Sequence, residues 1–165
     1  MQQITILGST GSVGVNALKI LREHPKLFGA YALTGNQNHD LMVAQCVEFT
    51  PRYAAMADSD SAVRLRVRLK ELNTRTEVLS GSQAISELAK STEPDCVIAA
   101  IVGTAGLLPT LAAVRAGKRV LLANKEVLVT CGRLFMNTAR ESRSEVIPID
   151  SEHNAIFQCL PPAVQ

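Results

Sequence analysis

The sequence predicts an α/β fold with a doubly wound, mainly parallel sheet and helices on both faces. Short apolar runs alternate with segments of helical spacing along the chain, the apolar residues are mostly aliphatic, and aromatic residues make up only 4% of the sequence. Strands buried between two helical layers are typically continuous aliphatic runs. A chain of 165 residues is long enough for one domain with a substantial core.

The expected elements follow one another in strict alternation. The predicted strands are short apolar runs bounded by turn residues: Ile4–Leu7, Ala30–Leu33, Tyr53–Met56, Glu77–Leu79, Cys96–Ala99, Val120–Ala123 and Val146–Ile149. The predicted helices lie between them: Val13–Arg22, His39–Phe49, Ser61–Leu72, Gln83–Ala89, Leu107–Ala116 and Gly132–Glu141. Right-handed crossovers then give a parallel sheet whose ligands lie beyond the carboxyl ends of the strands.

Charge and composition argue against several classes of partner. The formal net charge is +2, and no apolar stretch is long enough to span a bilayer, so we expect neither a nucleic-acid nor a membrane partner. The one basic run, at residues 64–70, is interleaved with apolar residues, which favours a solvated helix face over a phosphate or RNA patch. The four cysteines are widely spaced and form no C-x-x-C pair, which favours a reduced, cytoplasmic protein.

The first strand leads directly into a glycine-rich loop, Gly-Ser-Thr-Gly-Ser-Val-Gly at residues 8–14, which opens the first helix. This context is typical of a Rossmann-type dinucleotide site, although the glycine spacing differs from the usual fingerprint. Gly8 allows the sharp turn, Gly11 lets backbone amides approach a pyrophosphate, and Gly14 allows close packing of the helix. A purely structural turn is the alternative.

The end of the second strand bears on the choice between NAD and NADP. An NAD site usually has an acidic residue there to bind the ribose 2′-hydroxyl. This chain instead has Asn36, Gln37 and Asn38, whose amides could donate to a 2′-phosphate, so NADP is favoured. A polar turn without a ligand is the alternative.

Two polar clusters follow the last two predicted strands. Asn124, Lys125 and Glu126 place an amide, a cation and a carboxylate at the ligand-binding edge; the alternative is an ordinary helix start. Asp150 and Glu152 flank Ser151, so both carboxylates can converge on a hard divalent ion such as Mg²⁺ or Mn²⁺. Alternatively, Asp150 is the N-cap of a helix that has Glu152 in its first turn.

Taken together, the glycine loop, the segment Leu-Leu-Ala-Asn-Lys-Glu at 121–126 and the segment Pro-Ile-Asp-Ser-Glu-His-Asn-Ala-Ile-Phe-Gln at 148–158 closely resemble 1-deoxy-D-xylulose 5-phosphate reductoisomerases. The resemblance covers the whole chain. It implies an enzyme that rearranges its pentulose phosphate substrate and reduces it with NADPH to 2-C-methyl-D-erythritol 4-phosphate, in the non-mevalonate route to isoprenoid precursors.

The resemblance also implies roles for individual residues. The pyrophosphate would lie against Thr10, Gly11, Ser12 and Val13, the 2′-phosphate region against Asn36, Gln37 and Asn38, and the rest of NADPH against Asn124 and Glu126. Catalytic roles would fall to Lys125 and Glu152, substrate contacts to Lys125, Ser151 and Glu152, and metal ligation to Asp150 and Glu152.

The resemblance divides the chain into an NADPH-binding domain at 1–149 and the beginning of a catalytic domain at 150–165. Family members are considerably longer, contain a third metal-binding carboxylate and form homodimers, so we expect weak NADPH binding and no turnover from this chain alone. The competing hypothesis is a non-catalytic NADP-binding module from a truncated paralogue.

Overall fold

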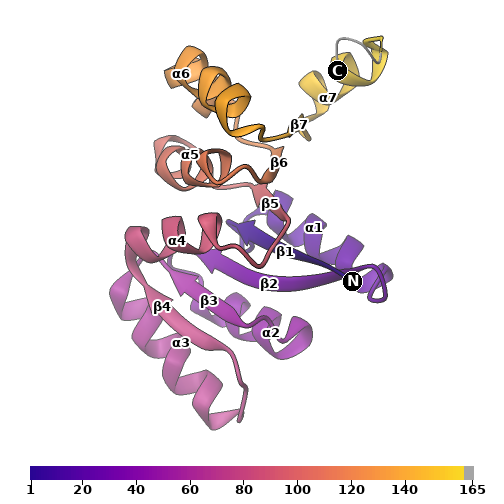
Figure 1. Cartoon of the computed structure of the whole chain (residues 1–165). Helices are drawn as coiled ribbons and strands as arrows, with labels where there is room; N and C mark the ends of the chain where they lie inside the picture. The colour runs from indigo at the N-terminus through magenta and orange to yellow at the C-terminus, as the bar shows by residue number, and fades with distance from the viewer. Residues whose placement is uncertain (162–165) are drawn as a thin grey trace.

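The computed structural model describes residues 1–161, which form one seven-stranded sheet with helices on both faces (Figure 1). The strands are β1 (Gln2–Leu7), β2 (Phe28–Gly35), β3 (Tyr53–Met56), β4 (Glu77–Ser80), β5 (Cys96–Ala99), β6 (Arg119–Leu122) and β7 (Val146–Pro148). Their order is β4-β3-β2-β1-β5-β6-β7, and every pairing is parallel. The doubly wound sheet predicted from the sequence is confirmed.

Six of the helices divide between the two faces of the sheet. One face is covered by α1 (Ser12–Glu23), α2 (His39–Phe49) and α3 (Ser59–Glu71), and the other by α4 (Gly81–Lys90), α5 (Leu107–Arg115) and α6 (Glu126–Ser142). Adjacent strand residues point to opposite faces, so Ile6 belongs to the core under α1–α3 and Leu7 to the core under α4–α6. Both side chains are fully buried.

Two helical segments differ from the sequence-based prediction. Helix α6 begins at Glu126, upstream of the predicted start at Gly132, and Cys131 interrupts it with φ −143° and ψ 31°. The predicted helix therefore corresponds to the part beyond a kink, which breaks the apolar periodicity. The segment after β7 forms α7 (Ser151–Cys159), which the sequence indicated only as an alternative. The last four residues of the predicted second domain, 162–165, lie outside the described residues.

The strand order reverses between β1 and β5, which are neighbours in the sheet although three strands separate them in the chain. Ligands of doubly wound sheets bind at such a reversal, beyond the carboxyl ends of the strands. The glycine loop follows β1 at this point, and the Asn-Lys-Glu and Asp-Ser-Glu clusters follow β6 and β7. Within residues 1–161, no helix combines the length and hydrophobicity that crossing a bilayer requires.

Candidate functional site

A cleft of about 520 Å³ opens at the reversal point of the sheet. Its walls come from the glycine loop, the ends of β2 and β3, the first turns of α4, and the segment that leads from β5 into α5. The predicted site residues that line it are Thr10, Gly11, Ser12, Val13 and Asn36. A cleft of this size at this position is typical of a nucleotide cofactor site.

The glycine loop needs its glycines at two positions. Gly8 has φ +84°, and a Cβ there would lie 2.8 Å from the Ala100 carbonyl oxygen. A Cβ on Gly14 would lie 2.3 Å from the Gly8 carbonyl oxygen, so only glycine lets α1 pack this closely on the loop. The N-cap of α1 is Gly11, which supplies no side-chain acceptor, so the first-turn N–H groups of α1 face the cleft edge uncapped. Such an end attracts an anion.

A buried polar layer fixes the loop from beneath. The Thr34 hydroxyl accepts from the Gly8 N–H at 3.0 Å, and the Thr34 carbonyl accepts from the Ser9 N–H at 2.8 Å. The Gln45 side chain of α2 donates to the Ser9 carbonyl at 2.9 Å and accepts from the Ser9 hydroxyl at 2.7 Å. Ser9, Thr34 and Gln45 are all buried, so the loop backbone is held in place without any ligand.

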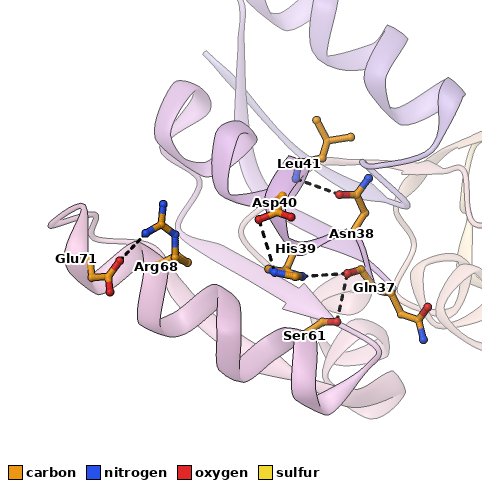
Figure 2. A network of polar contacts seen from close by, with 8 residues as sticks. All are labelled: Gln37, Asn38, His39, Asp40, Leu41, Ser61, Arg68 and Glu71. Atoms are coloured by element: carbon orange, nitrogen blue, oxygen red, sulfur yellow. Dashed lines mark hydrogen bonds and ion pairs between the residues drawn. The ribbon is translucent and has the colours of Figure 1, made fainter.

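The loop after β2 is ordered by helix caps (Figure 2). Asn38 caps α2 by accepting from the Leu41 N–H at 3.1 Å, and the Gln37 carbonyl accepts from the Ser61 hydroxyl of α3 at 3.2 Å. The exposed side chain of Gln37 extends away from this network. Of the three predicted 2′-phosphate residues, Asn36 lines the cleft, whereas Gln37 and Asn38 stand outside its lining.

Sequence reasoning missed one wall of the cleft, which is formed by Ser82, Gln83 and Ser86 of α4 together with Ala57 after β3. The sequence did contain a signal for this wall, because Gly81 and the polar residues after it follow the fourth strand, at the same edge of the sheet as the other motifs. This wall offers hydroxyl and amide groups opposite the glycine loop.

The Asn-Lys-Glu cluster joins β6 to α6 and has one buried member. Asn124 is 3% exposed, and its amide contacts the loop after β5, whereas Lys125 and Glu126 are exposed. The cluster therefore lies next to the cleft wall but outside the lining itself. A cation and a carboxylate are accessible there to a ligand that extends past the wall.

Asp150 is the N-cap of α7, as the alternative prediction had it, and accepts from the His153 N–H at 3.0 Å. Its Oδ1 also lies 2.7 Å from Nδ1 of His153. Partial desolvation acts to raise the pKa of Asp150, but the hydrogen bonds and charge of His153 outweigh it and leave the pKa below its usual value. Glu152 and Ser151 are exposed in the first turn of α7. Capping and metal ligation can coexist in one carboxylate, which has several lone pairs.

A complete metal site is not formed by residues 1–161, where no three His, Cys, Asp or Glu side chains come together in a suitable group. Asp150 and Glu152 therefore supply at most part of a ligand set. A hard divalent ion accepts further ligands from water or substrate oxygens.

Comparisons with known proteins agree with this geometry. The family model for 1-deoxy-D-xylulose 5-phosphate reductoisomerase matches residues 4–132. The enzyme of that name from Saccharophagus degradans is 57% identical over 161 residues, which are 98% of this chain and 41% of the relative. The enzyme from Actinobacillus pleuropneumoniae serotype 3 is 53% identical over 165 residues, which are 100% of this chain and 42% of the relative.

A solved structure gives the same result. A crystal structure of DOX-P reductoisomerase in complex with NADPH, fosmidomycin and magnesium matches with a TM-score of 0.97 and 45% identity, over 100% of this chain and 40% of that one. This chain thus spans about two fifths of the length of the proteins it matches. The match covers the sheet, the glycine loop and the polar clusters alike, and the chain belongs to the 1-deoxy-D-xylulose 5-phosphate reductoisomerase family.

Proposed function

We propose that this chain is the NADPH-binding part of a reductoisomerase that converts 1-deoxy-D-xylulose 5-phosphate into 2-C-methyl-D-erythritol 4-phosphate. The observation that carries the proposal is the cleft at the β1–β5 reversal, whose glycine loop presents the uncapped N-terminus of α1. The relatives that bear this name are longer than the chain, so the proposal for the whole reaction rests on family membership.

Each part of NADPH has candidate residues in or beside the cleft. Thr10–Val13 would hold the pyrophosphate, Asn36 and the α4 wall the adenosine, and the Asn36–Asn38 loop its 2′-phosphate. The segment after β5, with Asn124 and Glu126 beyond it, would hold the nicotinamide half. The bound cofactor supplies the hydride, while the chain orients it and excludes water.

The substrate and metal side of the proposal rests on β6 and β7, which are neighbours in the sheet. We place a magnesium or manganese ion on Asp150 and Glu152, and the substrate against Lys125, Ser151 and Glu152, with Lys125 and Glu152 as the catalytic pair. Exposed hard oxygen ligands and an exposed cation support this assignment. Residues 1–149 are then the cofactor domain, and α7 begins the catalytic domain.

Location and assembly complete the proposal. We propose a cytoplasmic protein that acts as a homodimer at the relatives' full length, without a nucleic-acid or membrane partner. The four cysteines are free thiols, and burial raises the pKa of Cys46 to about 12, which keeps that thiol protonated. The small net charge of +2 supports the absence of a polyanionic partner.

The sharpest test uses Ser12→Asp in the first turn of α1. A carboxylate there stabilises the helix through its dipole, by roughly 0.3–1 kcal/mol, but repels a pyrophosphate bound at the same end. We expect the melting temperature to stay level or rise while NADPH affinity, measured by fluorescence titration, falls at least about tenfold.

Thr92 is exposed in the loop before β5, at the edge of the sheet away from the cleft, so Thr92→Asp adds the same charge there and is a control that should leave affinity unchanged. The proposal fails if the folded wild-type chain gives no NADPH titration. It also fails if both aspartate variants bind NADPH as the wild type does.

A further inference from the structure

The side-chain amide of Asn124 makes three hydrogen bonds within the protein. Its Nδ2 donates to the carbonyls of Ile101 and Gly103, the latter at 3.0 Å. Its Oδ1 accepts from the Glu126 N–H at 3.0 Å. Both donor hydrogens of the amide are thus used by backbone oxygens. Because the residue is only 3% exposed, a cofactor group could accept from Nδ2 only by displacing the loop that it holds, and only the second lone pair of Oδ1 remains for a direct contact.

The carbonyls bound by Asn124 belong to the wall of the cleft. Ile101 lines the cleft, and so do Val102 and Thr104 on either side of Gly103. Gly103 has φ +69° and ψ −163°, a conformation that only glycine adopts without strain. Glycine has many other accessible conformations, so a contact from outside the turn helps to fix this one. The Asn124 amide supplies that contact from behind the wall.

The same amide is packed too tightly to adopt another position. A Cβ on Gly106 would lie 2.6 Å from Nδ2 of Asn124 and 2.5 Å from the Ile101 carbonyl oxygen. The Gly106 N–H donates to the Gly103 carbonyl at 3.3 Å, which closes the turn around the amide. Asn124 therefore joins the cleft wall to the start of α6, where Lys125 and Glu126 are exposed.

We infer that Asn124 is a positioning residue that sets the cleft wall at Ile101–Gly103 relative to the first turn of α6, and that it affects the cofactor through this loop. The inference rests on the proposed NADPH site. It assigns different roles to the two residues: Asn124 holds the wall, whereas the exposed side chain of Glu126 is free to contact the cofactor. Loss of the amide donors should loosen the wall even when no cofactor is present.

The test compares Asn124→Asp with Asn124→Ala and with Thr138→Val as a matched control. The aspartate variant keeps the acceptor for the Glu126 N–H but loses both donors. Thr138 is a buried polar residue of the same helix whose hydroxyl bonds only within α6, to the Leu134 carbonyl, and it is absent from the cleft lining. Amide hydrogen exchange is measured by NMR without cofactor, and NADPH affinity by titration.

We expect the Gly106 N–H of the Asn124→Asp variant to lose protection while the Glu126 N–H keeps it, and the alanine variant to lose both. NADPH affinity of the aspartate variant should fall about tenfold at neutral to alkaline pH, the equivalent of one buried hydrogen bond. The introduced carboxyl faces two carbonyl oxygens, so it is protonated readily and can then donate to one of them. The deficit relative to wild type should therefore shrink as the pH falls.

Two results would overturn the inference: wild-type protection of Gly106 in both Asn124 variants, or an unchanged NADPH affinity in both. Weaker affinity with an undisturbed wall would mean that Asn124 contacts the cofactor directly. If the aspartate variant does not fold, the alanine variant decides the exchange result. Failure of the wild-type chain to bind NADPH would instead count against the proposed function, while the exchange data would still test the link between Asn124 and the wall.

Discussion

Gln45 and Ser9 hold each other by two buried hydrogen bonds, one from the Gln45 amide to the Ser9 carbonyl and one from the Ser9 hydroxyl to the Gln45 amide oxygen. They are far apart in the sequence, and the contact fastens the glycine loop to the middle of α2. The loop therefore owes its shape to α2 as well as to its own glycines. A ligand that binds this loop meets a backbone that is already ordered.

Replacing Gln45 with methionine should weaken both folding and cofactor binding. The change keeps the side-chain volume but leaves the Ser9 carbonyl and hydroxyl with fewer partners in a dry site, which costs about 1–3 kcal/mol of unfolding free energy. Denaturant unfolding measures the loss, and Ser9→Ala completes a double-mutant cycle. A coupling energy near zero between residues 9 and 45 would mean that the two hydrogen bonds between Gln45 and Ser9 contribute nothing to stability.

Gly14→Ala should destabilise the fold and Gly132→Ala should stabilise it, although both glycines lie in helices. A methyl group at residue 14 meets the Gly8 carbonyl oxygen at 2.3 Å and must push α1 off the loop, so NADPH titration should lose its signal. At Gly132 nothing lies within 4 Å of the added methyl group, and the alanine should stabilise α6 by up to about 1 kcal/mol. Thermal melts of the two variants provide the comparison, and similar destabilisation of both would be inconsistent with it.

Gln37→Lys should raise the affinity for NADPH and leave NADH binding unchanged. The Gln37 side chain is exposed and extends from the loop that the proposal assigns to the 2′-phosphate, so a lysine adds a cation there without breaking the bonds of the loop backbone (Figure 2). We expect a gain of about three- to tenfold at low salt, which fades as ionic strength rises. Parallel titrations with NADPH and NADH decide the matter, and an equal gain for both would rule out a 2′-phosphate contact.

Asp58 should make the stability of the chain depend on pH in the acid range. Its carboxylate caps α3 and lies 2.8 Å from the Ser61 N–H, and the side-chain and backbone hydrogen bonds of Ser61 hold the pKa of Asp58 below its usual value. A carboxyl with a lowered pKa in the folded state stabilises the fold above its unfolded pKa of about 3.9 and loses that contribution as the pH falls through the folded value.

Asp58→Asn provides the comparison, because asparagine also caps helices but does not titrate in this range. The melting temperature of the wild type should exceed that of the variant above about pH 4 and converge with it in stronger acid. A constant difference across this range would show that the charge of Asp58 contributes nothing.

The sequence alone was sufficient for the architecture because that information is local. Aliphatic runs such as Cys96–Ala99 are typical of strands buried on both faces, and a glycine-rich loop directly after a strand is typical of the start of a helix, as α1 confirms. The rule that ligands bind at the carboxyl ends of parallel strands then pointed to Thr10–Val13 and Asn36, which line the cleft. Each of these inferences needed only neighbouring residues and a general rule.

The tertiary structure decided how the parts of the site are held, because those contacts join residues that are distant in the sequence. It brought Ser82 and Gln83 into the same cleft lining as the glycine loop. It also paired Gln45 with Ser9 and the Asn124 amide with the Gly103 carbonyl by hydrogen bonds. A periodic pattern records which residues are buried but not which buried polar groups satisfy one another. The sequence thus determined the fold and the position of the cleft, and packing determined which side chains line the cleft and which hold its wall.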